Sequence, residues 1–348
     1  MTGGGRAAGR AAGWASAGLT ALAGAALVVV DRSPRPVVRL VKELFERGGA
    51  AMAAKLRPHV PDGVTSTLGV PYRDDDADAR LSVHRRTDAV GTLPVVVWVH
   101  GGGWVSGSST DVDPYLEILA ARTDVVTVSV DYTLGPNAQH PTAVHQIDDA
   151  LRFLTEHAAR WQLDPERVVL AGDSAGAQLV TEYAALVTNP DFAAAVGTTP
   201  FLPPDRLRGM VLHCGVYDLA GLVHAPGLIG WGVEQVIWAY TGSRSLTDNP
   251  VLDRMTSTTA VSAHFPPTLM SAGNGDPLTP HQSVPFAARL VELGVPVETH
   301  FAAIDHVPSL GHEYQFDLAG TGGAAERLLD RTVTFLRERL GGAVATER

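Results

Sequence analysis

The sequence has little cysteine and little positive charge. Cys214 is its single cysteine, so no disulfide can form within the chain, and the apolar stretch 210–216 around it predicts a buried, unreactive thiol. Lys and Arg number 27 against 37 Asp and Glu, which gives a formal net charge of −10. Because no dense Lys/Arg stripe occurs, the counterion release that drives nucleic-acid binding is missing. We therefore expect no nucleic-acid partner.

Sequence patterns for metal and phosphate binding are also missing. The 13 histidines are scattered, no His-Glu-x-x-His segment occurs, and His140 and His145 lack the spacing of two ligands on one helical turn. The Gly-rich segment 101–103 is not followed by Gly-Lys-Ser/Thr, which argues against a phosphate-binding loop. We expect neither a metal site nor a cofactor.

Residues 11–30 form a stretch of twenty residues without a charged side chain. As a helix it would be about 30 Å long, which is the thickness of the hydrocarbon core of a bilayer. Ala and Gly dominate it, and their transfer into lipid is only weakly favourable. Three interpretations stay open: a membrane anchor, which we favour, a loose helix of a cytoplasmic protein, and a cleaved export signal.

From about Val64 onward, short apolar runs alternate with segments whose apolar residues recur every three or four positions. This alternation is typical of βαβ units and predicts an α/β fold with a mostly parallel sheet flanked by helices. The expected strands are residues 81–85, 94–99, 125–130, 168–171, 210–214, 267–272 and 297–304. The expected helices are residues 113–122, 145–159, 175–187, 281–293 and 324–340.

Two further segments lie outside this alternation. Residues 34–56 have the apolar spacing of an amphipathic helix, which we expect to pack on the main domain. Residues 218–265 replace an expected helix by a longer insertion that is rich in Trp and Leu. We predict a hydrophobic N-terminal segment at 1–31, a helical cap region at 32–63 and the main α/β domain at 64–348, with the insertion completing a small cap.

Gly172-Asp173-Ser174-Ala175-Gly176 matches the pattern G-x-S-x-G, in which a serine occupies a sharp, strained turn between a strand and a helix. Glycine at 172 and 176 lets strand and helix approach closely while Ser174 stands above the sheet. An apolar strand precedes the motif and a helical segment follows it, as such an elbow requires. We interpret Ser174 as a nucleophile, and a Gly-rich turn without chemistry is the alternative.

His100-Gly101-Gly102-Gly103-Trp104 directly follows the expected strand 94–99. Successive glycines let backbone N–H groups turn toward a carbonyl oxygen, and each donor that faces a developing oxyanion is worth on the order of 3 kcal/mol. The N–H of Ala175, the residue after the nucleophile, would add another donor. We interpret the segment as an oxyanion hole. Trp104, with Trp231 and Trp238 of the insertion, is a candidate substrate-binding residue.

A serine hydroxyl needs a histidine base that is oriented by a carboxylate, and α/β-hydrolases carry these residues in the order Ser, Asp or Glu, His. Asp276 follows the expected strand 267–272 through the turn Gly273-Asn274-Gly275, at the carboxyl edge of the sheet. It is the acid that we favour over Asp218, Asp253 and Asp305.

Two histidines compete for the role of base. His306 comes two residues after the expected end of the last strand at residue 304, so a short tether holds it at the edge where Ser174 and Asp276 lie. A loop that contains Pro308 and Gly311 separates His312 from that edge. We predict His306 as the base and keep His312 as its rival, whereas His300, inside the strand, is expected to be structural.

Four segments together resemble the hormone-sensitive-lipase-like family of bacterial esterases, which have the α/β-hydrolase fold: His100–Gly107 (HGGGWVSG), Val130–Pro136 (VDYTLGP), Asp164–Arg167 (DPER) and Gly172–Gly176 (GDSAG). The resemblance covers residues 64–340. It implies that Gly102, Gly103 and Ala175 form the oxyanion hole, and it supports Asp276, because Asp-Pro-Leu is the usual setting of the acid. The spacing from Asp276 to His306 also fits the family.

The sequence departs from the family at two places. Thr133 stands where the family usually has Arg, and His306-Val307-Pro308 stands where it usually has His-Gly-Phe. His312-Glu313-Tyr314 also places an aromatic residue two positions after a histidine, which keeps His312 open as the base.

The resemblance implies a serine carboxylesterase or lipase-like hydrolase that works through an acyl-enzyme. We expect the insertion 218–265 and the helix after Pro34 to form one wall of an apolar acyl pocket, with a preference for short to medium acyl chains. An arylformamidase or a feruloyl or acetyl-xylan esterase is the alternative, because these enzymes share His-Gly-Gly-x-Trp and the triad. A non-catalytic relative that only binds a small molecule is a further alternative. Candidates for all three triad residues are present, so we expect an enzyme with a small-molecule ester substrate, held at a membrane through residues 11–30.

Overall fold

The structure is a computed structural model that describes residues 32–222 and 227–341. The predicted membrane anchor at 11–30 lies outside the described residues. Within the described ranges, no helix combines the length and the apolar character needed to cross a membrane.

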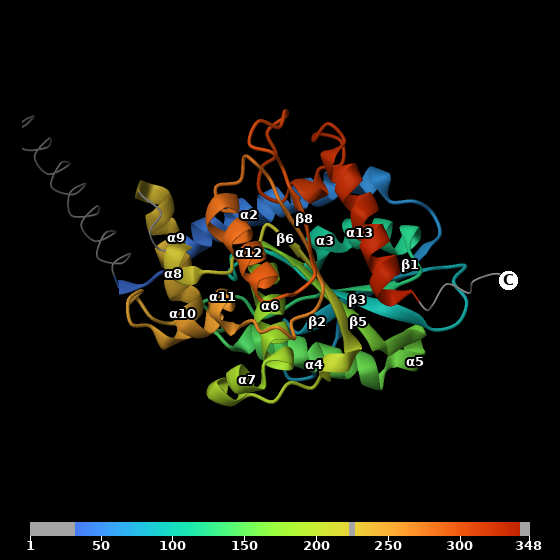
Figure 1. The fold of residues 1–348 in the computed structure, drawn as a ribbon, viewed down its shortest axis with the longest axis horizontal. Helices are drawn as coiled ribbons and strands as arrows, with labels where there is room; N and C mark the ends of the chain where they lie inside the picture. Colours follow the sequence, from blue (N-terminus) through green and yellow to red (C-terminus); the bar gives the residue numbers. More distant parts are fainter. Residues whose placement is uncertain (1–31, 223–226, 342–348) are drawn as a thin grey trace, which may run out of the picture.

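One sheet of eight strands forms the centre of the molecule, in the order β1-β2-β4-β3-β5-β6-β7-β8 (Figure 1). β1 pairs antiparallel with β2 and β2 with β4, while the other neighbours are parallel. The predicted α/β fold with a mostly parallel sheet is therefore confirmed. The strands are β1 (Val64–Pro71), β2 (Arg80–Arg86), β3 (Leu93–Val99), β4 (Val126–Val130), β5 (Leu163–Asp173), β6 (Leu207–His213), β7 (Thr268–Ala272) and β8 (Val297–Phe301).

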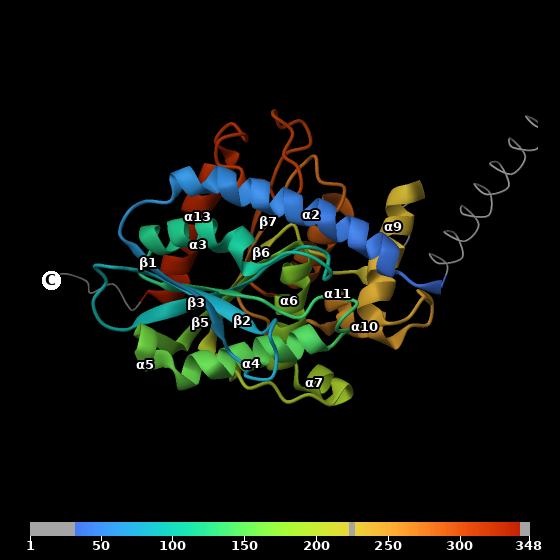
Figure 2. The same cartoon turned by 180° about the vertical axis from the view of Figure 1, so that it is seen from behind.

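Helices cover both faces of the sheet (Figures 1 and 2). One face packs against α3 (Ser109–Arg122) and α13 (Ala324–Leu340), and the other packs against α4 (Thr142–Glu156), α6 (Ser174–Thr188) and α12 (Val284–Glu292). Shorter elements complete this framework: η1 (Arg57–His59), α5 (Ala158–Trp161), α7 (Pro190–Val196), η2 (Pro204–Arg206), η3 (Thr279–Ser283) and η4 (Tyr314–Phe316).

Strand β3 shows why the central strands read as continuous apolar runs. Val95 and Val97 face the layer of α4 and α6, whereas Val96 and Trp98 face α3 and α13. Because successive side chains alternate between two covered faces, every position after Leu93 is buried. Strand β1 was missed for the opposite reason: it lies at the edge of the sheet and is largely uncovered, so its sequence carries no apolar run.

The cap consists of α2 (Arg35–Leu56) and the insertion helices α8 (Leu219–Leu222), α9 (Gly227–Thr241), α10 (Pro250–Met255) and α11 (Ser257–Ala260). Helix α2 lies across α3 and reaches α9 (Figure 2). Val38 of α2 is buried, but Leu40, Leu44 and Phe45 are 69%, 66% and 45% exposed. The predicted packing of α2 on the main domain therefore holds for only part of its apolar face.

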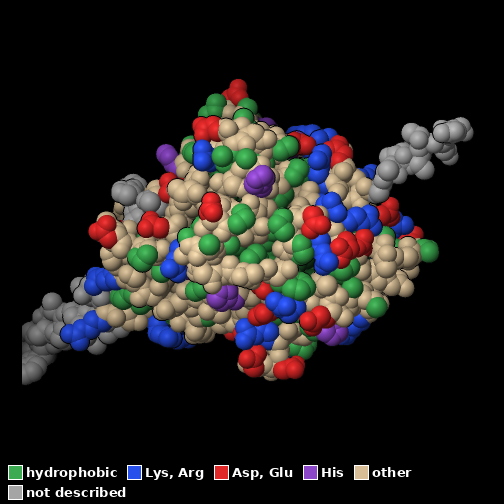
Figure 3. All heavy atoms as spheres, turned by 60° about the horizontal axis from the view of Figure 1, so that its bottom comes forward, with side chains coloured by type: hydrophobic (Ala, Val, Ile, Leu, Met, Phe, Trp, Pro, Cys, Tyr) green, Lys and Arg blue, Asp and Glu red, His purple; other side chains and the backbone are tan. Residues whose placement is uncertain are grey.

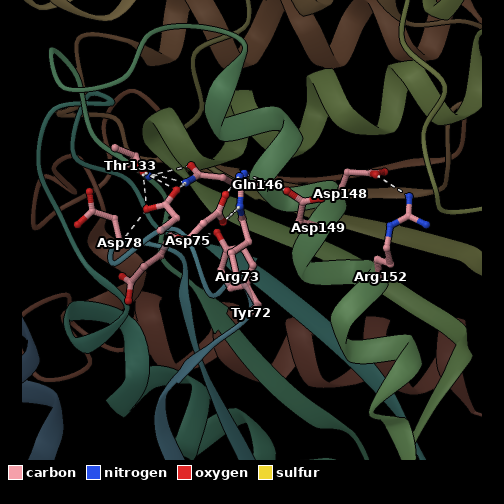
Figure 4. A network of polar contacts seen from close by, with 11 residues as sticks. Tyr72, Arg73, Asp75, Asp78, Thr133, Gln146, Asp148, Asp149 and Arg152 are labelled. Atoms are coloured by element: carbon pink, nitrogen blue, oxygen red, sulfur yellow. Dashed lines mark hydrogen bonds and ion pairs between the residues drawn. The ribbon is translucent and has the colours of Figure 1, made fainter.

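The face that carries α4, α5 and α7 mixes charges of both signs (Figure 3). Lys and Arg side chains lie among Asp and Glu side chains on this face. Arg73, for example, pairs with Asp75 and Asp149, and Arg152 pairs with Asp148 (Figure 4).

Candidate active site

Ser174 lies at the sharp turn that its motif predicts. It directly follows β5, begins α6 and has a left-handed backbone with φ 50°. A Cβ atom at Gly176 would overlap the carbonyl oxygen of Val99 at the end of β3. Only glycine allows this approach of α6 to the sheet, so the motif sets both the strain at Ser174 and the position of its hydroxyl.

His312, and not His306, lies between Ser174 and Asp276. Its Nε2 is 2.9 Å from Ser174 Oγ, and its Nδ1 is 2.8 Å from Asp276 Oδ2. In the tautomer that suits this chain of contacts, Ser174 donates to Nε2 and Nδ1–H donates to Asp276. His306 instead makes a 2.8 Å hydrogen bond from Nδ1 to the Pro308 carbonyl within an exposed loop. The expectation that His306 occupies the base position is wrong, and its rival takes that place.

The path of the chain after β8 explains the correction. Strand β8 ends at Phe301, three residues before the predicted end, and Ile304 and Val307 in the following loop are 90% and 88% exposed. The strand therefore does not extend to residue 304, and no two-residue link holds His306 at the edge of the sheet. The loop leaves the sheet before it returns toward the acid.

Leu310 anchors the returning chain. Its side chain is buried, its carbonyl accepts from Gly275 N at 2.7 Å, and its N–H donates to Asn274 Oδ1 at 2.9 Å. A Cβ atom at Gly273 would overlap the Leu310 carbonyl oxygen. These contacts join the loop to the turn that carries Asp276, and His312 follows two residues later. Ile304 and Val307 are apolar residues of the same loop and are exposed, so the sequence alone did not single out Leu310 as the residue that docks.

The surroundings of His312 have two opposing effects on its pKa. Burial disfavours the imidazolium and lowers its pKa, whereas the Cys214 sulfur, the Asp276 hydrogen bond and the Glu313 carboxylate raise it. The pKa of His312 is raised well above its ordinary value overall. Asp276 is fully enclosed and its Oδ1 accepts from Leu278 N at 2.9 Å, which fixes the carboxylate that orients the ring.

The glycine segment before Ser174 forms a tight loop. Gly102 and Gly103 have φ of 100° and 60°, and the carbonyl of Gly102 accepts from Val105 N and Ser106 N. The ring of His100 stacks on Tyr132 at 4.6 Å between centroids. These bonds hold the backbone of the loop in one conformation next to the elbow.

Trp104 supports this loop from inside the protein. Its side chain is buried, its indole N–H donates to Gln178 Oε1 at 3.0 Å, and its ring stacks on Tyr240 at 5.5 Å. A side chain enclosed in this way offers no surface to a substrate. The structure therefore gives Trp104 a supporting role instead of the predicted substrate contact.

Thr133, at the position where the resembled family usually has Arg, belongs to a hydrogen-bond network with Gln146 and Asp76 (Figure 4). Its N–H donates to Gln146 Oε1 at 2.9 Å, and Gln146 Nε2 donates to Thr133 Oγ1 at 2.8 Å and to Asp76 Oδ2 at 2.7 Å. The amide of Gln146 thus connects the loop after β4 with the loop between β1 and β2. Tyr132, which stacks on His100, is the neighbour of Thr133.

Two carboxyl groups beside the triad were missed in the sequence. Asp173 is buried, and its oxygens accept from Trp98 Nε1 at 2.7 Å and Gly101 N at 2.9 Å. Glu313 hydrogen-bonds to Asp173, and its Oε1 lies 3.9 Å from His312 Nε2. Burial, and then the charge of Glu313, raise the pKa of Asp173 well above its ordinary value.

Cys214 lies closer to the site than its apolar surroundings in the sequence suggested. It is buried, and burial raises the pKa of its thiol. Ligand atoms of Cys214, Asp276 and His312 lie within 4.8 Å of one another, the one such group among the described residues. Nδ1 and Oδ2 are 2.8 Å apart, whereas two N or O ligands of a tetrahedral zinc ion lie roughly 3.3 Å apart. The geometry fits a hydrogen bond better than a shared metal ion.

Cap side chains approach the glycine loop. Phe45 of α2 and Val236 of α9 would each lie 3.6 Å from a Cβ atom at Gly103. Trp231 is 40% exposed, and the Arg244 guanidinium lies 5.5 Å from the ring of Trp238. Helix α2 and the insertion therefore meet at Gly103, while substrate contacts of Trp231 and Trp238 stay predictions.

Comparisons with known proteins identify the family of the chain. A family model described as alpha/beta hydrolase fold matches residues 96–308. Esterase LipI of Mycobacterium tuberculosis is 30% identical over 254 residues, 72% of this chain and 74% of LipI. Carboxylesterase NlhH of the same organism is 29% identical over 228 residues, 64% of this chain and 66% of NlhH.

Solved structures share the fold. Esterase B from Lactobacillus rhamnosis has a TM-score of 0.73 and 21% identity, over 88% of this chain and 96% of that chain. Among the sequence relatives, the matched segment spans from 36% to 74% of their own length, and 63% for the putative alpha/beta hydrolase R526 of Acanthamoeba polyphaga mimivirus.

Proposed function

Because the chain belongs to the alpha/beta hydrolase family, whose model matches residues 96–308, we propose that it is a serine carboxylesterase. The observation that carries the proposal is the position of His312, whose two ring nitrogens lie 2.9 Å from Ser174 Oγ and 2.8 Å from Asp276 Oδ2. A nucleophile, a base and an orienting acid in hydrogen-bond contact are what acyl transfer through a covalent intermediate requires.

In the proposed reaction, Ser174 Oγ attacks the ester carbonyl carbon while His312 Nε2 accepts the serine proton. The buried Asp276 carboxylate stabilises the imidazolium that forms. Backbone N–H groups of Gly102, Gly103 and Ala175 donate to the oxyanion. His312 then returns the proton to the leaving alcohol oxygen, and water hydrolyses the acyl-enzyme by the same steps.

We assign the acyl chain to the apolar surface where the cap meets the glycine loop. Phe45 and Val236 lie next to Gly103, so an acyl chain whose carbonyl oxygen sits in the oxyanion hole would pass along them. The exposed Leu44 and Trp231 extend the apolar surface outward. This small, open wall supports a preference for short to medium chains.

A substrate panel separates the proposed activity from its alternatives. p-Nitrophenyl esters from acetate to palmitate, N-formylkynurenine and methyl ferulate should be offered to the same preparation, and we expect the short and medium p-nitrophenyl esters to be turned over fastest. Fastest turnover of N-formylkynurenine or methyl ferulate would favour an arylformamidase or a feruloyl esterase instead.

The nucleophile is tested separately. Ser174→Ala should abolish hydrolysis and labelling by a fluorophosphonate probe, because it removes the hydroxyl that is in hydrogen-bond contact with His312 Nε2. Labelling that persists in this variant would refute the assignment. A wild-type protein that neither hydrolyses an ester nor becomes labelled would point to the non-catalytic alternative.

A further inference from the structure

Glu313 brings a carboxylate into the active site directly beside the base. Its Oε1 lies 3.9 Å from His312 Nε2, the same nitrogen that contacts Ser174 Oγ. The Glu313 side chain is 34% exposed, so solvent and a substrate can reach it. Its left-handed backbone, with φ 59°, is unusual for a glutamate and is held by the η4 turn that follows.

Glu313 lies beside the buried carboxyl group of Asp173. Asp173 is buried under Gly101, where two N–H donors and the hydrogen bond to Glu313 surround it. Burial disfavours a charge on Asp173, whereas Glu313 is the more exposed carboxyl group of the two.

The position of Nε2 defines where the alcohol part of an ester must lie. His312 has to protonate the leaving oxygen, so this oxygen comes within about 3 Å of Nε2 during the reaction. A nitrogen that is two carbons away from the ester oxygen lies about 3–4 Å from it by ordinary bond lengths. Such a nitrogen is therefore within reach of the Glu313 carboxylate.

We propose that Glu313 makes this site selective for esters whose alcohol carries a cationic nitrogen two carbons from the ester oxygen, such as amino-alcohol and quaternary-ammonium-alcohol esters. The inference rests on the proposed esterase function. It assigns the charge of Glu313 to the recognition of the leaving alcohol, in addition to any effect of that charge on His312.

The test compares two substrates that differ in one atom. Butyrylcholine and 3,3-dimethylbutyl butyrate have the same shape and release the same acid, but only the first carries a positive charge. The ratio of their kcat/KM values, measured by titration of the released butyrate, cancels every effect of Glu313 on the triad itself. We expect a ratio of about ten in the wild type, as for one partly exposed charge pair.

Two variants then test whether the charge of Glu313 causes the difference between the two substrates. Glu313→Gln keeps the size and hydrogen-bonding groups of the side chain, and its ratio should fall to about one. Asp305→Asn removes the same charge from an exposed position on the same connection between β8 and η4, and its ratio should stay at the wild-type value. In the wild type, 0.5 M NaCl should lower the ratio severalfold because added salt screens the pair.

The possible results distinguish a failure of the proposed selectivity from a failure of the proposed esterase function. A wild-type ratio near one, or a ratio that neither Glu313→Gln nor salt changes, overturns the selectivity while the esterase function stands. The salt measurement decides the case without a variant if Glu313→Gln does not fold. If the wild type hydrolyses neither substrate nor p-nitrophenyl butyrate, the proposed function fails and the selectivity fails with it.

Discussion

Gly273→Ala should lower the catalytic rate while the protein stays folded, because Gly273 contacts the loop that carries the base His312. An added Cβ atom would overlap the Leu310 carbonyl oxygen and lie 2.7 Å from the carbonyl oxygen of Gly311. This is about 0.5–1 Å inside van der Waals contact, so the loop must move by about that distance. His312 follows directly and would move with it.

The expected size of the effect follows from that displacement. A shift of about 1 Å in a catalytic group costs on the order of 10² in rate, so kcat for p-nitrophenyl butyrate should fall about 100-fold. Forcing a methyl group into a packed contact costs about 1–3 kcal/mol of unfolding free energy, which leaves a domain of this size folded. Circular dichroism and thermal unfolding should therefore show a native fold with a slightly lowered Tm.

Gly311→Ala is the matched control. Gly311 lies in the same loop, one residue before His312, and no atom lies within 4 Å of the position of its Cβ. This variant should keep kcat within about twofold of the wild type, since an unobstructed methyl group displaces nothing. Equal activities of the two alanine variants would refute the argument that docking of Leu310 on the Gly273 turn positions the base.

Three further outcomes are expected. His312→Ala should lower kcat at least about 10³-fold, whereas the kcat of His306→Ala should stay within severalfold of the wild type. Steady-state kinetics of both variants check this prediction. The reverse order of the two kcat values would make His306 the base. Because the base must be neutral and the pKa of His312 is raised well above its ordinary value, activity should decline as the pH falls through that raised pKa. Glu313→Gln removes one charge that raises this pKa, so the acid limb of kcat/KM against pH should move to lower pH; an unmoved limb would show that Glu313 does not act on the base. Phe45→Ala should weaken the preference for butyrate over acetate esters severalfold by removing apolar surface beside Gly103, and an unchanged chain-length profile would place the acyl chain elsewhere.

The sequence alone determined the strands β2 to β8 of the sheet and the positions of Ser174 and Asp276. Apolar strands that are covered on both faces read as continuous runs, and the turn at Ser174 depends on residues within a few positions of it. The Gly273-Asn274-Gly275 turn likewise places Asp276 by local geometry at the end of β7. Features of this kind need no knowledge of distant contacts.

Only the tertiary structure decided which histidine meets the serine. The loop after β8 is shaped by Leu310, whose partner Asn274 lies 36 positions earlier, so the distance of a histidine from the strand end did not predict its place. Trp104 became a buried support because Gln178, 74 positions away, accepts its N–H and Tyr240 of the insertion covers its ring. The pairing of Glu313 with Asp173 likewise joins two distant segments. Local patterns specify turns and strands, but a contact between remote segments exists only once the chain has folded back on itself.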